Sequence, residues 1–309
     1  MLTDQEILAR RGPKAILEHH RAYAAVWEEE PDATGTLVPT AVIFLTNREC
    51  PFRCVMCDLW VHTLDDVIAE GMIPEQIRAA MAALPAARQV KLYNAGSFFD
   101  AQAVPPEDDE EIATLLAPFD RVIVEAHPAY LRGPYGERCL QFRDLLRGRL
   151  EVAIGLETAN RDVLARLNKR MTLQDFGHAA GFLREHDVDV RAFVLLQPPF
   201  MPPEEAVEWG CRSLDAAFDA GATVCSVIPT RGGNGVMEAV GAVPPLLTAL
   251  ESVLEYGVTI ARGRVFADLW DLQRFYTCAC SPARAERLRA MNRTQRIPPP
   301  ILCDCTARH

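Results

Sequence analysis

Six short apolar segments, separated by helix-like stretches, constrain the fold of this chain most strongly. The segments read LVPTAVIFLTN, RQVKLYNAG, RVIVEAHP, LEVAIGLET, VDVRAFVLLQPP and ATVCSVIPT, and between them lie stretches such as IPEQIRAAMAALPAA and RDVLARLNKR. Strands that alternate with helices are typical of a parallel α/β sheet or barrel. Helices on both faces of such a sheet explain why the strands are almost continuously apolar. The sequence therefore predicts an α/β fold whose chemistry lies at the carboxyl ends of the strands.

Length and composition allow one barrel-sized domain with additions at each end. The chain has 309 residues, of which 49% are apolar and 24% charged, values close to those of ordinary globular proteins. We expect a helical N-terminal segment over residues 1–36, the barrel over residues 37–274 and a cysteine-rich extension over residues 275–309. No long uncharged apolar run occurs and the N-terminal residues lack the apolar centre of a signal peptide, so we expect a cytoplasmic protein without a membrane partner.

Three cysteines lie within eight residues, directly after the first predicted strand. Cys50, Cys54 and Cys57 stand in the stretch NRECPFRCVMCDLW. Thiolates at this close spacing can bind three irons of a [4Fe–4S] cluster and leave the fourth iron open to an outside ligand. A structural zinc site is normally closed by four protein ligands. The spacing thus favours a reactive cluster, with a zinc loop or chance clustering as the alternative.

The segment CPFRCVMC resembles the signature of the radical S-adenosylmethionine (SAM) superfamily, with Phe52 before the second cysteine and Val55 and Met56 before the third. This resemblance implies a partial (β/α)6 TIM-like barrel with a [4Fe–4S] cluster and SAM as cofactors. It also implies that one electron from an external donor, such as a flavodoxin or ferredoxin, allows SAM to be cleaved to methionine and a 5′-deoxyadenosyl radical. That radical abstracts a hydrogen atom from the substrate.

Two further segments match places where family members bind SAM. In YNAGSFFD, the resemblance assigns Asn94, Gly96 and Ser97 to the SAM amino group, although this segment departs from the commoner Gly-Gly-Glu form. A glycine here permits close approach of the backbone to a ligand. The alternative is an ordinary turn after a strand.

The segments GLETAN and LARLNKR resemble the methylthiotransferase and elongator-type branches and the branch of the archaeosine synthase radical SAM subunit. The resemblance implies that Glu157 accepts hydrogen bonds from the SAM ribose and that Lys169 or Arg170 pairs with its carboxylate. Asn168 belongs to the same expected cofactor-binding set. The alternative is that Asn168, Lys169 and Arg170 only cap an exposed helix.

Two features after the strands remain open from sequence alone. The segment PTRGGNG follows the sixth strand and is expected to wrap the adenine or a substrate. His127 either faces the site or is a buried histidine satisfied by a neighbour. No catalytic acid or base is assigned.

The C-terminal region holds two Cys-x-Cys pairs on either side of a basic helix. We name the four residues, Cys278, Cys280, Cys303 and Cys305, the tail cysteines. Four thiolates suffice to close either a zinc or a [4Fe–4S] site, so we expect a second metal site with a structural or electron-relay role. The alternative is that they are free structural cysteines. Cys139, Cys211 and Cys225 are expected to be ordinary buried residues.

The function predicted from these observations is radical SAM chemistry on a small-molecule or nucleobase substrate, with lyase chemistry of the archaeosine synthase kind as one form. The formal net charge of −10 argues against an extensive phosphate-binding surface, so tRNA is expected as a partner only if another protein supplies the basic surface. The alternative is a non-enzymatic iron–sulfur electron-transfer or metal-binding protein on the same scaffold.

Overall fold

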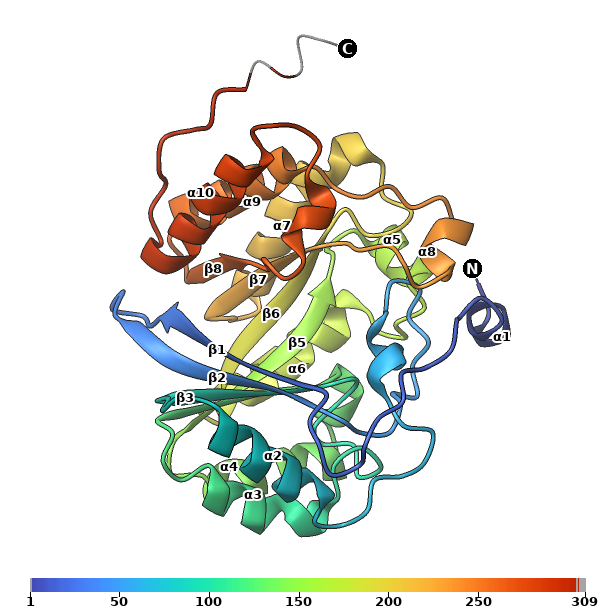
Figure 1. Ribbon diagram of the computed structural model, residues 1–309, viewed down its shortest axis with the longest axis vertical. Helices are drawn as coiled ribbons and strands as arrows, with labels where there is room; N and C mark the ends of the chain where they lie inside the picture. The colour runs from blue at the N-terminus through green and yellow to red at the C-terminus, as the bar shows by residue number, and fades with distance from the viewer. Residues whose placement is uncertain (1, 304, 306–309) are drawn as a thin grey trace.

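The computed structural model describes residues 2–303 and 305, which form one curled eight-stranded sheet with helices on its outside (Figure 1). The strands follow one another in the sheet in chain order: β1 (Ala24–Pro31), β2 (Leu37–Leu45), β3 (Gln89–Asn94), β4 (Arg121–Glu125), β5 (Arg149–Glu157), β6 (Asp189–Leu196), β7 (Val224–Pro229) and β8 (Arg264–Ala267). Strands β2 to β8 are parallel, and β1 pairs antiparallel with β2. The predicted TIM-like partial barrel is confirmed.

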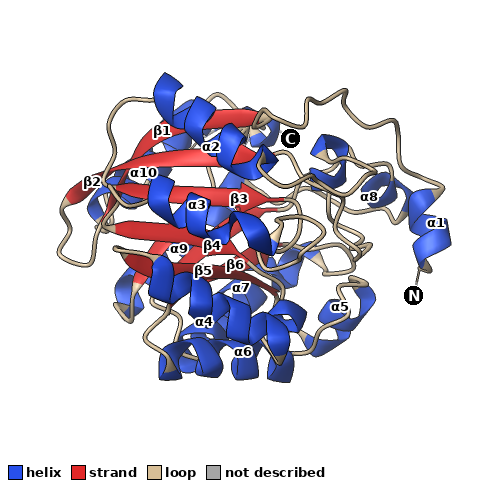
Figure 2. Ribbon diagram, turned by 90° about the horizontal axis from the view of Figure 1, so that it is seen from below, coloured by secondary structure: helices blue, strands red, loops and turns tan. Residues whose placement is uncertain are grey.

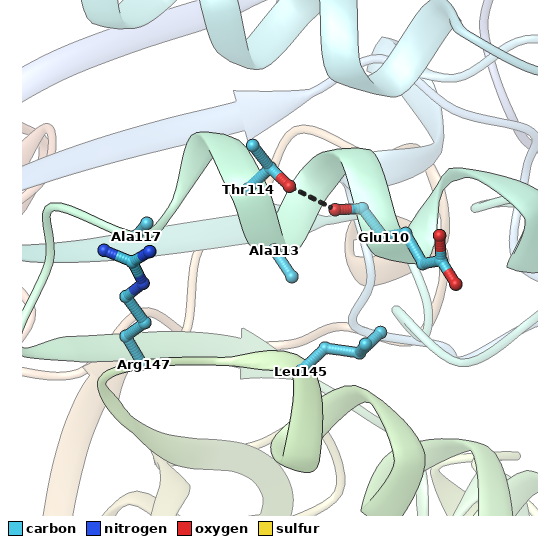
Figure 3. Close-up of a pocket in the computed structure, with 6 residues that line it drawn as sticks. All are labelled: Glu110, Ala113, Thr114, Ala117, Leu145 and Arg147. Carbon is cyan, nitrogen blue, oxygen red and sulfur yellow. Dashed lines mark hydrogen bonds between the residues drawn. The ribbon is translucent and has the colours of Figure 1, made fainter.

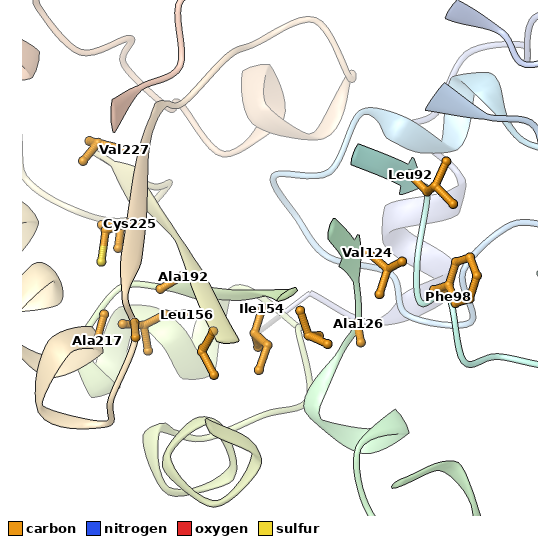
Figure 4. Packing of buried hydrophobic residues seen from close by; sticks show 14 of the residues in the cluster. Leu92, Phe98, Val124, Ala126, Ile154, Leu156, Ala192, Ala217, Cys225 and Val227 are labelled. Carbon is orange, nitrogen blue, oxygen red and sulfur yellow. The ribbon is translucent and has the colours of Figure 1, made fainter. Parts of the chain in front are cut away.

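Helices cover the outer face of the sheet (Figure 2). The helices along the outside are α2 (Met72–Ala83), α3 (Asp109–Leu115), α4 (Pro134–Leu145), α6 (Leu173–Glu185), α7 (Ala206–Asp219), α9 (Leu247–Ile260) and α10 (Ser281–Thr294). The short helices α1 (Asp4–Leu8), α5 (Arg161–Arg166) and α8 (Val236–Ala239) lie beyond the carboxyl ends of the strands. Alternate strand residues such as Leu92, Val124 and Ile154 are fully buried in the main apolar cluster (Figure 4). Side chains alternate between the two faces of a strand, so the remaining positions line the inside of the curl.

The six predicted strands correspond to β2 through β7, whereas β1 and β8 were not predicted. Within the segment over residues 1–36 that was expected to be helical, the structure has the short helix α1 and then strand β1. The reason lies in the sequence AAVWEEEP of β1, which has no apolar alternation because its buried position Glu30 is a carboxylate. The strand pairs with β2 over its whole length, and ion pairs of Glu30 add to that ladder.

Glu30 lies in a cluster of buried charges that fills the inside of the curl near the amino ends of the parallel strands. Lys91 of β3 lies 2.6 Å from Glu30, and Arg191 of β6 lies 2.5 Å from Glu30 and 2.6 Å from Glu151. Arg264 of β8 donates to the Pro31 carbonyl at 2.7 Å. Because β1 is not a sheet neighbour of β6 or β8, these contacts cross the interior and join the two edges of the sheet.

This charge cluster fixes the ionisation of Glu30. Burial alone would raise the pKa of the Glu30 carboxyl, but Arg191 and Lys91 hold that pKa well below its usual range. The amino end of the barrel is therefore filled by satisfied ion pairs, which leaves the carboxyl ends of the strands as the place for chemistry. None of the described helices combines the length and apolar character needed to cross a bilayer.

Candidate functional site

The cysteine loop, which is the segment from Cys50 to Cys57, follows β2 at the carboxyl edge of the sheet. Its three cysteines are half-buried. Burial raises the pKa of Cys50 to about 11, that of Cys57 to about 12, and that of Cys54 as well. Cys50 and Cys54 both lie close enough to the Lys169 ammonium to feel its charge. Thiols of this kind are protonated at neutral pH in the absence of a cation, so a bound metal would have to displace their protons.

Segments that are distant in the sequence hold the cysteine loop through its backbone. The amide of Val55 donates to the Leu167 carbonyl at 2.9 Å, and the Asn168 side chain donates to the Arg53 carbonyl at 2.8 Å. Asn234, which is 3% exposed, donates its side-chain amide to the carbonyls of Val55 at 2.8 Å and of Cys57 at 3.0 Å. The segment PTRGGNG thus supports the cysteine loop, a role that the sequence did not indicate.

Gly96 lies against Cys50, and Asn94 and Ser97 flank it in the chain. A Cβ atom on Gly96 would lie 3.2 Å from Cys50 Cβ, and Gly96 has a φ of +141° that favours glycine. The side-chain nitrogen and oxygen of Asn94 and the hydroxyl of Ser97 are buried, and among the described residues they have no hydrogen-bond partner. Because buried polar atoms are normally satisfied, this arrangement fits a site that receives a polar ligand.

Glu125, the last residue of β4, is a half-buried carboxyl that was not among the site residues expected from the sequence. It accepts a hydrogen bond from the Asn94 backbone amide at 2.6 Å. Burial raises the pKa of Glu125 to about 8, with a further increase from Glu157. The sequence did contain a signal, because Glu125 is the single acidic residue directly after the apolar residues VIV in the segment RVIVEAHP.

Glu157 and Lys169 form a buried ion pair at the end of β5. Glu157 has a φ of +65°, and the register with β6 shifts between Gly155 and Glu157, which turns the end of the strand. Gly155 leaves room for the pair, because a Cβ there would overlap with both charged groups. Burial alone would lower the pKa of Lys169, but the Glu157 carboxylate raises it above its usual value. The cation that pairs with Glu157 is therefore Lys169.

Asn168 and Arg170 are engaged by the N-terminal helix instead. The Asn168 side chain donates to Asp4 at 2.8 Å, and the Arg170 guanidinium pairs with the same carboxylate. Both residues also have positive φ angles, 56° and 58°. They connect α1 to the cysteine loop, and their expected direct role in cofactor binding stays a prediction.

His127 is a neutral, fully bonded side chain. Its Nδ1 accepts the Ala129 amide at 3.1 Å, so Nε2 carries the proton and donates to the Lys169 carbonyl at 3.0 Å. The ring stacks on Phe52 with centroids 4.0 Å apart. Burial lowers the pKa of His127 to about 4. Of the two readings that the sequence left open, the satisfied buried histidine is the one observed.

The tail cysteines come together as expected, because all four sulfur atoms lie within 4.8 Å of one another. Two hollows of the surface offer no comparable chemistry. One, of about 340 Å³, lies between Glu110, Thr114, Leu145 and Arg147 on the outer helices (Figure 3). The other, of about 290 Å³, lies beside Asn168, Arg170 and Thr172.

Three comparisons place this geometry among known proteins. No family model matches the chain. Archaeosine synthase subunit beta of Methanosarcina acetivorans is 31% identical over 212 residues, which are 63% of this chain and 58% of that protein. The subunit of the same name from Thermococcus kodakarensis is 33% identical and covers 59% of each chain. The chain thus spans less than two thirds of these two relatives.

Relatives by structure show the same barrel. Methylornithine synthase superposes with a TM-score of 0.53 at 14% identity, over 72% of this chain and 64% of the other. An N-terminally shortened Elp3 of Methanocaldococcus infernus superposes with a TM-score of 0.52 at 14% identity, over 74% of this chain and 56% of that one. The barrel and the cysteine loop, with these similarities, confirm the resemblance to the radical SAM superfamily. In sequence, the chain is similar to archaeosine synthase subunit beta over part of its length.

Proposed function

We propose that this chain is a radical SAM enzyme in which Cys50, Cys54 and Cys57 bind a [4Fe–4S] cluster. The observation that carries the proposal is the contact of Gly96 with Cys50, flanked by the buried polar side chains of Asn94 and Ser97, which have no hydrogen-bond partner among the described residues. A protein that only transfers electrons does not need buried polar atoms beside its cluster to bind a ligand, whereas a SAM-binding enzyme does. When bound, the cluster and SAM supply a 5′-deoxyadenosyl radical that abstracts a hydrogen atom.

The residues around the loop divide the task of holding SAM. Asn94 and Ser97 offer hydrogen bonds to its amino acid end, and Gly96 allows the backbone to approach it closely. Glu125, half-buried beside this segment, accepts from the ammonium group, a task of the acidic residue in the commoner Gly-Gly-Glu form. Glu157 accepts from the ribose hydroxyls, while Lys169 pairs with that carboxylate and holds it in place.

Asn168 and Arg170 act on the same site indirectly in this proposal. Asn168 bridges Asp4 and the Arg53 carbonyl, so it fixes the loop that carries the thiolates. Arg170 secures the other oxygen of Asp4 and thereby holds α1 over this side of the barrel. Both are positioning residues whose loss would disturb cluster binding before SAM affinity.

The inner face of the sheet supports a planar substrate. Phe44, Tyr93 and Phe193 are half-buried, and the ring centroids of Tyr93 lie 6.1 Å from Phe44 and 5.9 Å from Phe193. Because β3 and β6 are not neighbours in the sheet, the second contact crosses the interior above the charge cluster. Aromatic faces of this kind stack on nucleobases. A nucleobase substrate is therefore our preferred form, in line with the name archaeosine synthase of two archaeal relatives. Lyase chemistry is what the resemblance to that branch adds to this proposal.

Two further partners belong to this proposal. A flavodoxin or ferredoxin supplies the electron that reduces the cluster. A second protein supplies the basic surface if the base belongs to a tRNA, since the chain carries a formal net charge of −10.

Calorimetric titration of the anaerobically reconstituted protein with SAM tests the site. Replacing Glu157 with alanine should raise the SAM dissociation constant by about tenfold or more, as expected for the loss of a hydrogen bond of about 1.5–3 kcal/mol to a charged group. Glu208→Ala, which changes an exposed carboxylate of α7, serves as control and should leave the affinity unchanged. If Glu157→Ala binds SAM as tightly as the parent protein, Glu157 does not hold the ribose.

A further inference from the structure

The four tail cysteines are spaced for a single metal ion. Cys278 Sγ lies 3.8 Å from Cys303 Sγ, and Cys280 Sγ lies 3.8 Å from Cys305 Sγ. Four thiolates around one zinc ion at about 2.3 Å form a tetrahedron whose edges are about 3.8 Å long. In a [4Fe–4S] cluster each thiolate binds a different iron, which separates the sulfur atoms by about 6 Å or more. All four sulfurs lie within 4.8 Å of one another, so the cluster does not fit.

We propose that the tail cysteines bind one zinc ion in a tetrahedral thiolate site, and that this ion locks the C-terminal helix over an open edge of the sheet. Iron–sulfur chemistry is then confined to the loop after β2. Binding releases the thiol protons, as thiolates are the metal ligands. No electron is transferred, because zinc has no redox chemistry. The inference does not depend on the proposed function of the barrel.

The chain on both sides of α10 is built to bring the two cysteine pairs together. Before the helix, the buried Ser281 hydroxyl accepts the amides of Thr277 at 3.1 Å and Cys278 at 3.2 Å, which fixes the first pair at the helix start. After the helix, the chain returns along it, because Arg287 donates to the Pro298 and Pro299 carbonyls at 2.8 Å each. This return places the second pair beside the first.

Charge around the site is suited to an anionic metal centre. A zinc ion with four thiolates carries a net charge of about −2. Cys280 precedes the first residue of the fourteen-residue helix α10, whose amino end carries partial positive charge. Arg284, one turn into the helix, donates to the Ile301 carbonyl at 3.1 Å and pairs with Glu251. The arginine is thus held beside the returning segment.

Helix α10 covers the free edge of β8. The side chain of Asn292 donates to and accepts from the backbone of Ala267, at 2.8 and 2.9 Å. Gln295 does the same with Val265, at 3.0 and 2.9 Å. An uncovered edge strand invites pairing with other chains, so these amides protect it. A metal site that joins the chain before α10 to the segment that returns after it keeps this cover in place.

Metal analysis of a chain that lacks the first cysteine group tests the proposal. In the variant Cys50→Ala, Cys54→Ala, Cys57→Ala, any metal must come from elsewhere in the chain. We expect about one zinc per chain and no acid-labile sulfide. Iron with sulfide, a metal content near zero, or a disulfide between tail cysteines found by mass spectrometry would each overturn the proposal.

A second set of variants tests the structural role. Cys303→Ser with Cys305→Ser should abolish zinc binding, and limited proteolysis should then cut the chain near residue 275 at least tenfold faster. Cys211→Ser, which changes a half-buried cysteine of α7, should retain the zinc. If the double variant does not fold, titration of the intact protein with a thiol-modifying reagent should release one zinc per chain as four thiols react. Unchanged proteolysis of a zinc-free folded variant, or release of no zinc from the intact protein, would refute the proposal.

Discussion

Removing one member of the buried Glu157–Lys169 pair should destabilise the protein far more than removing both. The two side chains are 9% and 11% exposed, so either one left alone is a buried charge without a partner. Breaking such a pair costs about 3–5 kcal/mol, whereas replacing both members by neutral groups of similar size is often close to neutral. We therefore expect Lys169→Met to cost about 3 kcal/mol or more, and Lys169→Met with Glu157→Gln to restore most of that loss.

Urea unfolding of the cluster-free protein at pH 7.5, followed by circular dichroism, measures these differences. With a slope of about 3 kcal/mol per M, Lys169→Met should lower the midpoint by about 1 M. The matched control is Glu208→Ala, which breaks a 2.6 Å pair with Arg212 on the exposed face of α7. That change should cost less than about 0.5 kcal/mol. The prediction is wrong if the unfolding free energy of Lys169→Met lies within about 1 kcal/mol of the parent value and Glu157→Gln does not change the effect of Lys169→Met. The Glu157 carboxylate would then not need its partner.

Three further predictions concern the surroundings of the cysteine loop. Gly96→Ala forces a Cβ to within 3.2 Å of Cys50 Cβ at a φ of +141°, so iron content after reconstitution should fall by half or more; full iron loading would contradict the close contact. Asn234→Ala leaves two backbone carbonyls of the cysteine loop unpaired and should lower the free energy of unfolding by about 2–4 kcal/mol, measured by thermal unfolding. A change below about 0.5 kcal/mol would show that Asn234 does not hold the loop. The pKa of Glu125 is raised to about 8, so the folded protein holds the Glu125 proton more tightly than the unfolded chain does. The free energy of unfolding that this protonation supplies is complete below about pH 4.5 and is lost as pH rises through 8. The cluster-free protein should therefore lose a few kcal/mol between pH 5 and 9, and Glu125→Gln should flatten this part of the profile; parallel profiles would show that burial does not raise this pKa.

The parts of the fold that follow a local pattern were predictable from sequence. Strands β2 to β7 are apolar runs between helix signals, and the cysteine groups are visible as spacings along the chain. Strand β1 was not predictable, because Glu30 is stabilised by Lys91 and Arg191, which come from distant strands. The sequence around β1 does not indicate that cations from β3 and β6 lie beside Glu30.

The candidate site likewise combines contacts that short sequence motifs predict with contacts that only the fold creates. The pairing of Glu157 with Lys169 connects residues twelve apart and was proposed from sequence as one of two alternatives. The clamp between Asn234 and Val55 connects residues 179 apart, and it depends on how the loop after β7 folds over the loop after β2. Likewise, the position of Glu125 beside Asn94 follows from the parallel pairing of β3 with β4, which no short motif encodes.

Formation of 5′-deoxyadenosine tests the central claim most directly. The protein is reconstituted anaerobically with iron and sulfide, reduced in the presence of SAM, and assayed for 5′-deoxyadenosine by mass spectrometry. The account predicts that the parent chain and Cys211→Ala produce 5′-deoxyadenosine and methionine in equal amounts, and that Cys54→Ala produces neither. Production at the parent rate by Cys54→Ala, or no production by a parent chain shown to carry four irons on its first cysteine group, would contradict it.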